Sequence, residues 1–239
     1  MRILHLYAKT NHSVELPPEI VKQIPPRYGI VAAIQETESL EHIRSQLKDA
    51  IIAGQILGCR QERAQAIADK VDGFLYIGTG FFHPIGLYLS TKKPILIYNP
   101  TDNTLKPLEQ KDVDNFTKQR KASKLRFLKA ETVGIIVSSK TGQNGIMSAL
   151  RLKQRTDKKY YIFGVDTLNY SELQNFPFIQ CWVNTACPRI VDEKNDVVNI
   201  EDVREFLQLE KFNEHLDVNQ VRNNDEKEVK DGPAIKILS

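Results

Sequence analysis

The sequence predicts an α/β protein of two tandem units, with parallel sheets flanked by helices and a ligand cleft between the units at the strand carboxyl ends. Compact apolar runs of strand length, such as residues 29–34 and 71–77, suit parallel strands that are covered on both faces. Residues 39–51 instead carry apolar side chains at helical spacing. Strands that alternate with helices favour a parallel sheet.

The first unit is predicted to cover residues 1–105. Its expected elements are a strand at 2–7, one helical turn at 19–23, a strand at 29–34, helices at 39–51 and 62–70, and strands at 71–77 and 94–98. A polar stretch at 101–111, which contains Pro107, is expected to hold the boundary.

The second unit is predicted to cover residues 106–239 and to repeat this plan. Its expected elements are a charged helix at 113–128, strands at 133–138, 160–165 and 178–184, a helix at 145–154, one turn at 171–175, and a closing helix at 201–209. Residues 213–232 are polar and lack apolar periodicity, so we expect a loop or a wrapping tail there. Residues 234–238 could return as an edge strand.

Composition limits the classes of function. The chain has 239 residues, of which 41% are hydrophobic and 26% charged, and its formal net charge of +3 gives no reason to expect direct nucleic-acid binding. No apolar run approaches the roughly 20 residues of a membrane span, and the first ten residues lack a signal-peptide pattern. We therefore expect a cytoplasmic protein without a membrane partner. Three cysteines are too few for a disulfide framework, which leaves buried thiols, metal ligands or a nucleophile.

Two of the three cysteines occur where ligands are expected. Cys59 follows Gly58 in a predicted turn, and Cys187 follows a strand and precedes Pro188. Ligands of open parallel sheets bind at the carboxyl ends of the strands, so both sulfurs could point into one shared cleft. Cys181 lies inside an apolar strand and is expected in the core. From the residues alone, a buried apolar thiol remains an alternative for all three.

Polar turns at three strand ends supply candidate ligand-binding groups. Glycine turns and helix starts can present backbone N–H groups to a carboxylate or phosphate. A tight turn, a helix cap or a structural histidine are the alternatives. The candidates are Gln35, Gly78, Gly80, His83, Ser139, Lys140 and Gln143. A run of lysines and arginines at 118–129 is typical of a solvated helix face. The alternative interpretation is a binding site for an acidic macromolecule.

Six segments together resemble the second and third domains of the diphthamide-synthesis family. They occur in the family's order and span nearly the whole chain. The segments are GIVAAIQ (29–35), GQILGC (54–59), VDGFLYIGTGFFHPIGL (71–87), FLKA (127–130), GIIVSSKTGQ (134–143) and NTACPRI (184–190). The most specific parts are GQILGC, the FHPIG turn, SSKTGQ and ACPR.

The resemblance implies a fold, cofactors and a reaction. Family members have three similar α/β domains, each giving one cysteine to a four-iron–four-sulfur (4Fe-4S) cluster that binds S-adenosylmethionine. The reduced cluster cleaves S-adenosylmethionine and releases a 3-amino-3-carboxypropyl radical. This radical attacks a histidine of elongation factor 2, the protein substrate. By this resemblance Cys59 and Cys187 are the second-domain and third-domain ligands. The turns at 78–83 and 139–143 are then expected to line the same cavity.

The chain also differs from the family in its expected number of domains and cysteine ligands. No cysteine precedes Cys59, and the family's first domain is expected to be missing. A cluster on this chain would therefore be incomplete or shared, with a homo-oligomer or a partner chain supplying the missing part. The alternative function is that of a cluster-free accessory or scaffold protein that keeps the fold.

Overall fold

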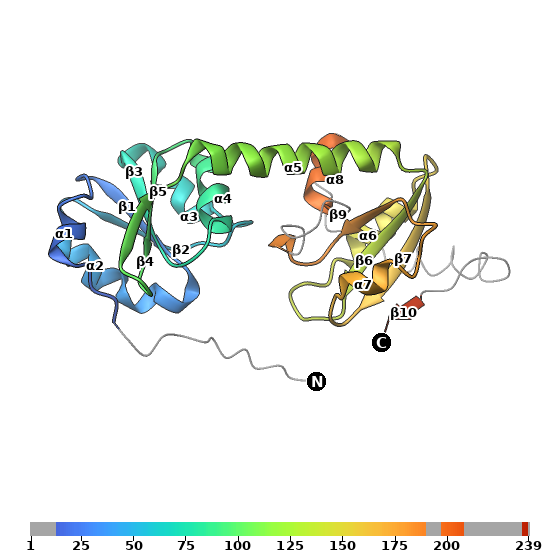
Figure 1. The fold of residues 1–239 in the computed structure, drawn as a ribbon, viewed down its shortest axis with the longest axis horizontal. Helices are drawn as coiled ribbons and strands as arrows, with labels where there is room; N and C mark the ends of the chain where they lie inside the picture. The colour runs from blue at the N-terminus through green and yellow to red at the C-terminus, as the bar shows by residue number, and fades with distance from the viewer. Residues whose placement is uncertain (1–12, 190–196, 208–235, 239) are drawn as a thin grey trace. The chain divides into compact units, whose positions relative to one another are not determined.

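The computed structural model describes residues 13–189, 197–207 and 236–238, and divides the chain into two compact units (Figure 1). The units are Met1–Phe116 and Thr117–Ser239, so the division falls within helix α5 (Gln110–Lys129). Among the described helices, none is both long and apolar enough to cross a membrane.

The first unit is built on a five-stranded sheet of order β2-β1-β3-β4-β5. β1 to β4 are parallel, and β5 joins the edge antiparallel. The strands are β1 (Tyr28–Ala32), β2 (Ile51–Gln55), β3 (Gly73–Ile77), β4 (Ile95–Asn99) and β5 (Thr104–Pro107). The helices are α1 (Pro18–Val21), η1 (Ile34–Ser39), α2 (Leu40–Gln46), α3 (Glu62–Gln65), η2 (Ala68–Lys70) and α4 (Phe82–Thr91).

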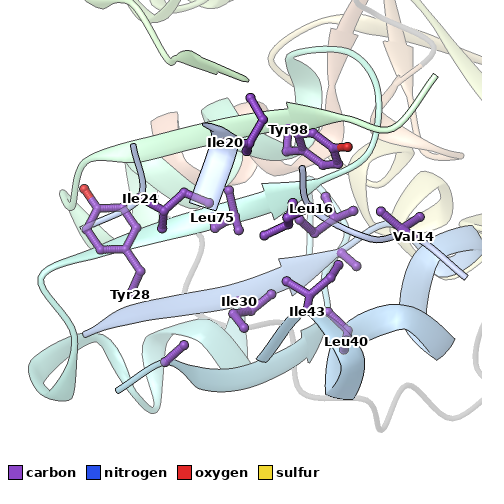
Figure 2. Close-up of a cluster of buried hydrophobic side chains, with 13 residues drawn as sticks. Val14, Leu16, Ile20, Ile24, Tyr28, Ile30, Leu40, Ile43, Leu75 and Tyr98 are labelled. Carbon is purple, nitrogen blue, oxygen red and sulfur yellow. The ribbon is translucent and has the colours of Figure 1, made fainter. Parts of the chain in front are cut away.

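Both faces of this sheet are covered, which explains the continuous apolar runs in β1 and β3. Successive residues of a strand point to opposite faces, so Ile30 packs into one cluster and Val31 into the other. Figure 2 shows the first cluster, in which Leu40 and Ile43 of α2 lie beside Ile30. Helices α3 and α4 contribute to the second cluster.

The second unit has an all-parallel sheet of order β10-β7-β6-β8-β9. Its strands are β6 (Thr132–Ser138), β7 (Lys159–Val165), β8 (Cys181–Asn184), β9 (Val197–Asn199) and β10 (Lys236–Leu238). One face packs against α5, α6 (Ile146–Lys153) and α8 (Ile200–Phe206). The other face carries an aromatic cluster with Phe163 and Trp182, next to α7 (Tyr170–Leu173).

The predicted fold class is confirmed in its α/β character and its parallel sheets flanked by helices. The helix predicted at 39–51 is wrong in its second half, because it ends at Gln46 and residues Ile51–Gln55 form β2. Leu47 is extended and Asp49 has a left-handed φ of 55°, which together end the helix.

Other differences affect one helix and several strands. The helix predicted at 62–70 is divided into α3 and the 3-10 helix η2. β5 lies in the polar stretch that was expected to hold only a boundary, and Pro107 is tolerated there because β5 is an edge strand. β9 was not predicted, and the strand predicted at 178–184 begins only at Cys181. β10 occupies part of 234–238 as an edge strand, as predicted. The strand predicted at 2–7 and the tail at 213–232 lie outside the described residues.

Asp202 ties α8 to α5 within the second unit, and its replacement gives a first prediction. Its side chain is only 3% exposed and accepts hydrogen bonds from Arg120, 2.8 Å from Nε. We expect Asp202→Ala to lower the free energy of unfolding by about 2 kcal/mol, because a buried charge-assisted pair is broken while Arg120 stays partly hydrated. Urea denaturation measures the loss.

Glu205 provides the matched control for this prediction. Its carboxylate lies 2.7 Å from Lys124 on the same helix pair, but its side chain is 68% exposed. We expect Glu205→Ala to cost well under about 1 kcal/mol, as is usual for surface ion pairs. Equal losses for the two replacements would contradict the role given to burial at Asp202.

Candidate functional site

The candidate residues of the first unit lie at the carboxyl ends of its parallel strands. Gln35 is exposed in η1, directly after β1, and Cys59 is exposed in the turn after β2. Gly78 and Gly80 follow β3, and His83 lies in the first turn of α4. Because the ends of parallel strands share one edge of a sheet, the fold brings these candidates to the same edge.

Cys59 occupies the tip of a tight turn between Leu57 and Arg60. The backbone N–H of each of these two residues donates to the carbonyl of the other, at 3.1 Å. Ile56, just before the turn, still donates to Ala32 of β1 at 3.1 Å, so the turn starts directly from the sheet. The prediction that Cys59 is exposed in a turn is therefore confirmed.

The Cys59 turn packs closely on helix α4. A Cβ on Gly58 would lie 2.1 Å from the ring of Phe82, and a Cβ on Gly86 would lie 2.5 Å from the carbonyl oxygen of Gly58. Gly86 therefore requires glycine, because the clash is with backbone, and any other residue at position 58 would force the Phe82 ring to move. This contact joins the two most specific sequence segments of the unit, GQILGC and FHPIG.

The glycine turn after β3 orients His83. Gly78 and Gly80 have φ angles of 148° and 76°, which favour glycine. The hydroxyl of Tyr76, a fully buried residue, lies 3.1 Å from Nδ1 of His83. His83 was expected in the turn itself, and the structure places it one step later, in the helix that the turn opens.

The second unit presents its own polar turn after β6. The Ser139 hydroxyl donates to Asp166 at 2.8 Å, and Ser139 N–H donates to the carbonyl of Val165 at 2.9 Å. Lys140 is exposed, and Gln143 is half-buried. Gly142, with a φ of 77°, allows the chain to turn toward α6. Asp166 directly follows β7. The sequence did not indicate it as a site residue, because its partner Ser139 is distant in sequence.

Cys187 lies half-buried in the loop after β8. The same loop is fixed to the sheet at Thr185, whose N–H and hydroxyl donate to the carbonyl of Ile136 at 3.1 and 2.7 Å. A Cβ on Gly145, the residue before α6, would lie 2.3 Å from the carbonyl oxygen of Thr185. Helix α6 therefore starts in close contact with the Cys187 loop.

Cys181 is buried in β8 with 1% exposure and belongs to the apolar core, as predicted. Within the described residues, no three histidine, cysteine, aspartate or glutamate side chains are arranged to hold a metal ion. Two thiols in turns at strand ends fit thiolate ligation of an iron–sulfur cluster, and the buried Cys181 does not. A shared cleft for Cys59 and Cys187 stays a prediction.

The two cysteines lie in loops that follow non-equivalent strands of the two sheets. The order β2-β1-β3-β4 in the first unit matches β7-β6-β8-β9 in the second. Cys59 follows β2, whereas Cys187 follows β8, which corresponds to β3. The two units are therefore similar in topology but present the cysteine on different loops, a difference that reading along the sequence did not reveal.

Comparison with known families gives one extended match. The model of the family described as "Putative diphthamide synthesis protein" matches residues 3–196. A curated relative from Pyrococcus horikoshii, named 2-(3-amino-3-carboxypropyl)histidine synthase, is 34% identical over 140 residues, covering 57% of this chain and 39% of the relative. A relative of the same name from Methanocaldococcus jannaschii is 31% identical over 162 residues, covering 64% of this chain and 46% of the relative. The chain spans about two fifths to one half of the length of these relatives.

The fold is similar to a solved structure described as Dph2 from Pyrococcus horikoshii with a 4Fe-4S cluster. The TM-score is 0.63 at 25% identity, covering 80% of this chain and 60% of that chain. Other relatives are named as subunits of the same synthase. Subunit 1 of Caenorhabditis elegans is 27% identical, covering 69% of this chain and 45% of the relative. Subunit 2 of Cryptococcus neoformans is 30% identical, covering 43% and 21%.

Proposed function

The chain belongs to the diphthamide synthesis protein family, and from this premise we propose that it takes part in transferring a 3-amino-3-carboxypropyl group from S-adenosylmethionine to a histidine of elongation factor 2. The observation that carries the proposal is the position of Cys59 and Cys187, each in a turn that follows a parallel strand. The relatives named 2-(3-amino-3-carboxypropyl)histidine synthase, and the Dph2 structure with a 4Fe-4S cluster, support it. The reaction is proposed for the cytoplasm.

Cys59 and Cys187 are the proposed ligands of a 4Fe-4S cluster, because soft thiolates are the usual ligands of such clusters. A reduced cluster held there would supply the electron for reductive cleavage of the bond between the sulfonium sulfur and the aminocarboxypropyl carbon, which yields 5′-methylthioadenosine and a 3-amino-3-carboxypropyl radical. Two thiolates are fewer than such a cluster usually has. We therefore propose that a partner chain, or another copy in a homo-oligomer, contributes the remaining ligand.

The polar turns are proposed to hold S-adenosylmethionine. The turn with Gly78 and Gly80 can direct backbone N–H groups at a carboxylate. His83 can donate from Nε2 when Tyr76 donates to its Nδ1. In the second unit, Lys140 and Gln143 offer side-chain donors for the same anionic group, and Gln35 offers an amide. Ser139 would join them by exchanging its hydroxyl bond to Asp166 for one to the ligand. Under this proposal, residues 1–105 and 106–239 correspond to the family's second and third domains.

A transfer experiment tests the function directly. The chain is reconstituted anaerobically with iron and sulfide, together with the candidate partner chain, and incubated with elongation factor 2, dithionite and carboxyl-labelled S-adenosylmethionine. We expect label in the factor only when both chains are present, and none when the target histidine of the factor is replaced. Unlabelled factor with a fully loaded complex would contradict the proposal.

A second candidate function rests on the ligand count. The burial of Cys181 leaves two accessible cysteines in the 239 residues, which favours a cluster-free accessory or scaffold role. The relatives named as subunits 1 and 2 are consistent with work in a complex. If the chain raised a partner's activity while both Cys59→Ala and Cys187→Ala retained this effect, the accessory role would be preferred.

A further inference from the structure

The buried side chain of Asn184 is bonded entirely to the Cys187 turn and its neighbour strand. Asn184 is 0% exposed, and its Oδ1 accepts from the N–H of Ala186 at 2.9 Å. Its Nδ2 donates to the carbonyl of Cys187 and to Oδ1 of Asn199, both at 2.9 Å. A single buried amide thus fixes the backbone on both sides of the Cα of Cys187.

Asn199 extends this arrangement by one residue. Its Nδ2 donates to the carbonyl of Pro188 at 3.2 Å. Asn199 is the residue before α8, where asparagine commonly caps the helix, yet its side chain makes no capping hydrogen bond. The side chain is instead committed to the Cys187 turn, so helix stability does not explain its placement.

The Cys59 turn has a corresponding amide in the first unit. Gln61 is 7% exposed, and its Nε2 donates to the carbonyl of Leu57, the first residue of the turn. Its Oε1 is buried and finds no hydrogen-bond partner among the described residues. An apolar side chain of similar size would avoid the cost of that unpaired oxygen. The feature that favours an amide at this position is therefore the hydrogen bond from Nε2 to the turn.

We propose that Asn184, Asn199 and Gln61 are positioning residues that hold the Cys187 and Cys59 turns in the form that binds metal, before any metal arrives. The inference rests on the proposed function for the assignment of Cys59 and Cys187 as metal ligands, whereas the hydrogen bonds that hold the turns stand on the structure alone. Turns that are already ordered lose little further freedom when the sulfur is ligated, and supporting contacts of this kind strengthen metal binding.

The test begins with the metal-free chain and hydrogen exchange measured by NMR. We expect Asn184→Leu to speed exchange of the Ala186 N–H by about tenfold, which corresponds to one lost hydrogen bond. The strand amide of Trp182 should be unchanged. Gln61→Leu should speed exchange of the Arg60 N–H, which donates to the same Leu57 carbonyl as Gln61, and should leave exchange in the Cys187 turn unchanged.

Matched controls separate positioning from general stability. Gln180→Leu removes an amide that accepts from Glu131 and Thr132, away from the cysteine turn of the same unit. Gln46→Leu removes the amide that pairs with Leu16 in the first unit. Neither control should change exchange in the cysteine turns. If Asn184→Leu does not fold, Asn199→Leu serves instead, with faster exchange expected across the Cys187 turn.

Iron retention then links the turn to the metal. After anaerobic reconstitution with iron and sulfide, we expect Asn184→Leu to weaken iron retention by about tenfold, because loss of a hydrogen bond that orients a metal ligand commonly has an effect of this size. Unchanged exchange in a folded variant would overturn the inference, and so would a loosened turn with unchanged iron retention. If the wild-type chain bound no iron even together with its partner chain, the proposed function would fail, while exchange in the metal-free chain would still decide whether the amides hold the turns.

Discussion

Replacing Cys59 or Cys187 with alanine is expected to abolish the iron that the chain holds after anaerobic reconstitution with ferrous iron and sulfide. Each residue supplies one of the two thiolates proposed from this chain, and loss of either leaves a single sulfur that cannot anchor a cluster. Iron and sulfide analysis of the desalted protein measures the effect. We expect the wild-type chain to hold less than one full cluster, because its ligand set is incomplete.

Cys181→Ala is the matched control for this result. The residue is a cysteine of the same chain, but it packs as a small apolar side chain in the core of the second unit. Its replacement should leave iron content unchanged and lower stability slightly. Iron that survives both Cys59→Ala and Cys187→Ala, or that is lost in a folded Cys181→Ala protein, would place the site elsewhere.

The second large effect is expected at Gly145, where helix α6 meets the Cys187 loop. Gly145→Ala would place a Cβ 2.3 Å from the carbonyl oxygen of Thr185. That oxygen belongs to the backbone of a loop held by two hydrogen bonds, so it cannot move away easily. We expect the free energy of unfolding to fall by about 2 to 3 kcal/mol, within the range for overpacking. Urea denaturation followed by circular dichroism measures it.

Gly164→Ala provides the control in the same unit. Gly164 lies in β7, its backbone is not left-handed, and an added Cβ would meet nothing within 4 Å. We expect its replacement to be neutral or mildly stabilising, because alanine restricts the unfolded chain. A loss at Gly164 as large as the loss at Gly145 would show that the contact with Thr185 is not the cause.

The fold could be predicted largely from apolar runs, because strands buried on both faces carry a strong signal. Residues 29–34 and 71–77 were assigned correctly for that reason. β2 was missed because Ile51 continues the helical spacing of α2, and the left-handed residue Asp49 that breaks the helix leaves no apolar signal. β5 was missed because edge strands tolerate polar residues and Pro107.

The candidate site could be predicted only where local sequence decides exposure. The glycine beside Cys59 and the proline after Cys187 indicated turns, and the apolar neighbours of Cys181 indicated the core. Asn184 and Gln61 could not be found in this way. Their roles depend on hydrogen bonds that form only when the turn, the strand and the neighbouring helix are assembled.

We propose above that this chain contributes ligands to a cluster that cleaves S-adenosylmethionine at the aminocarboxypropyl carbon. The most direct measurement is chromatographic analysis of the adenosine products after anaerobic reduction of the reconstituted chain with its partner. We expect 5′-methylthioadenosine to form with the wild-type and Cys181→Ala proteins and to be absent with the Cys59→Ala and Cys187→Ala proteins. Formation of 5′-deoxyadenosine, or of 5′-methylthioadenosine at the wild-type level in both cysteine variants, would contradict it.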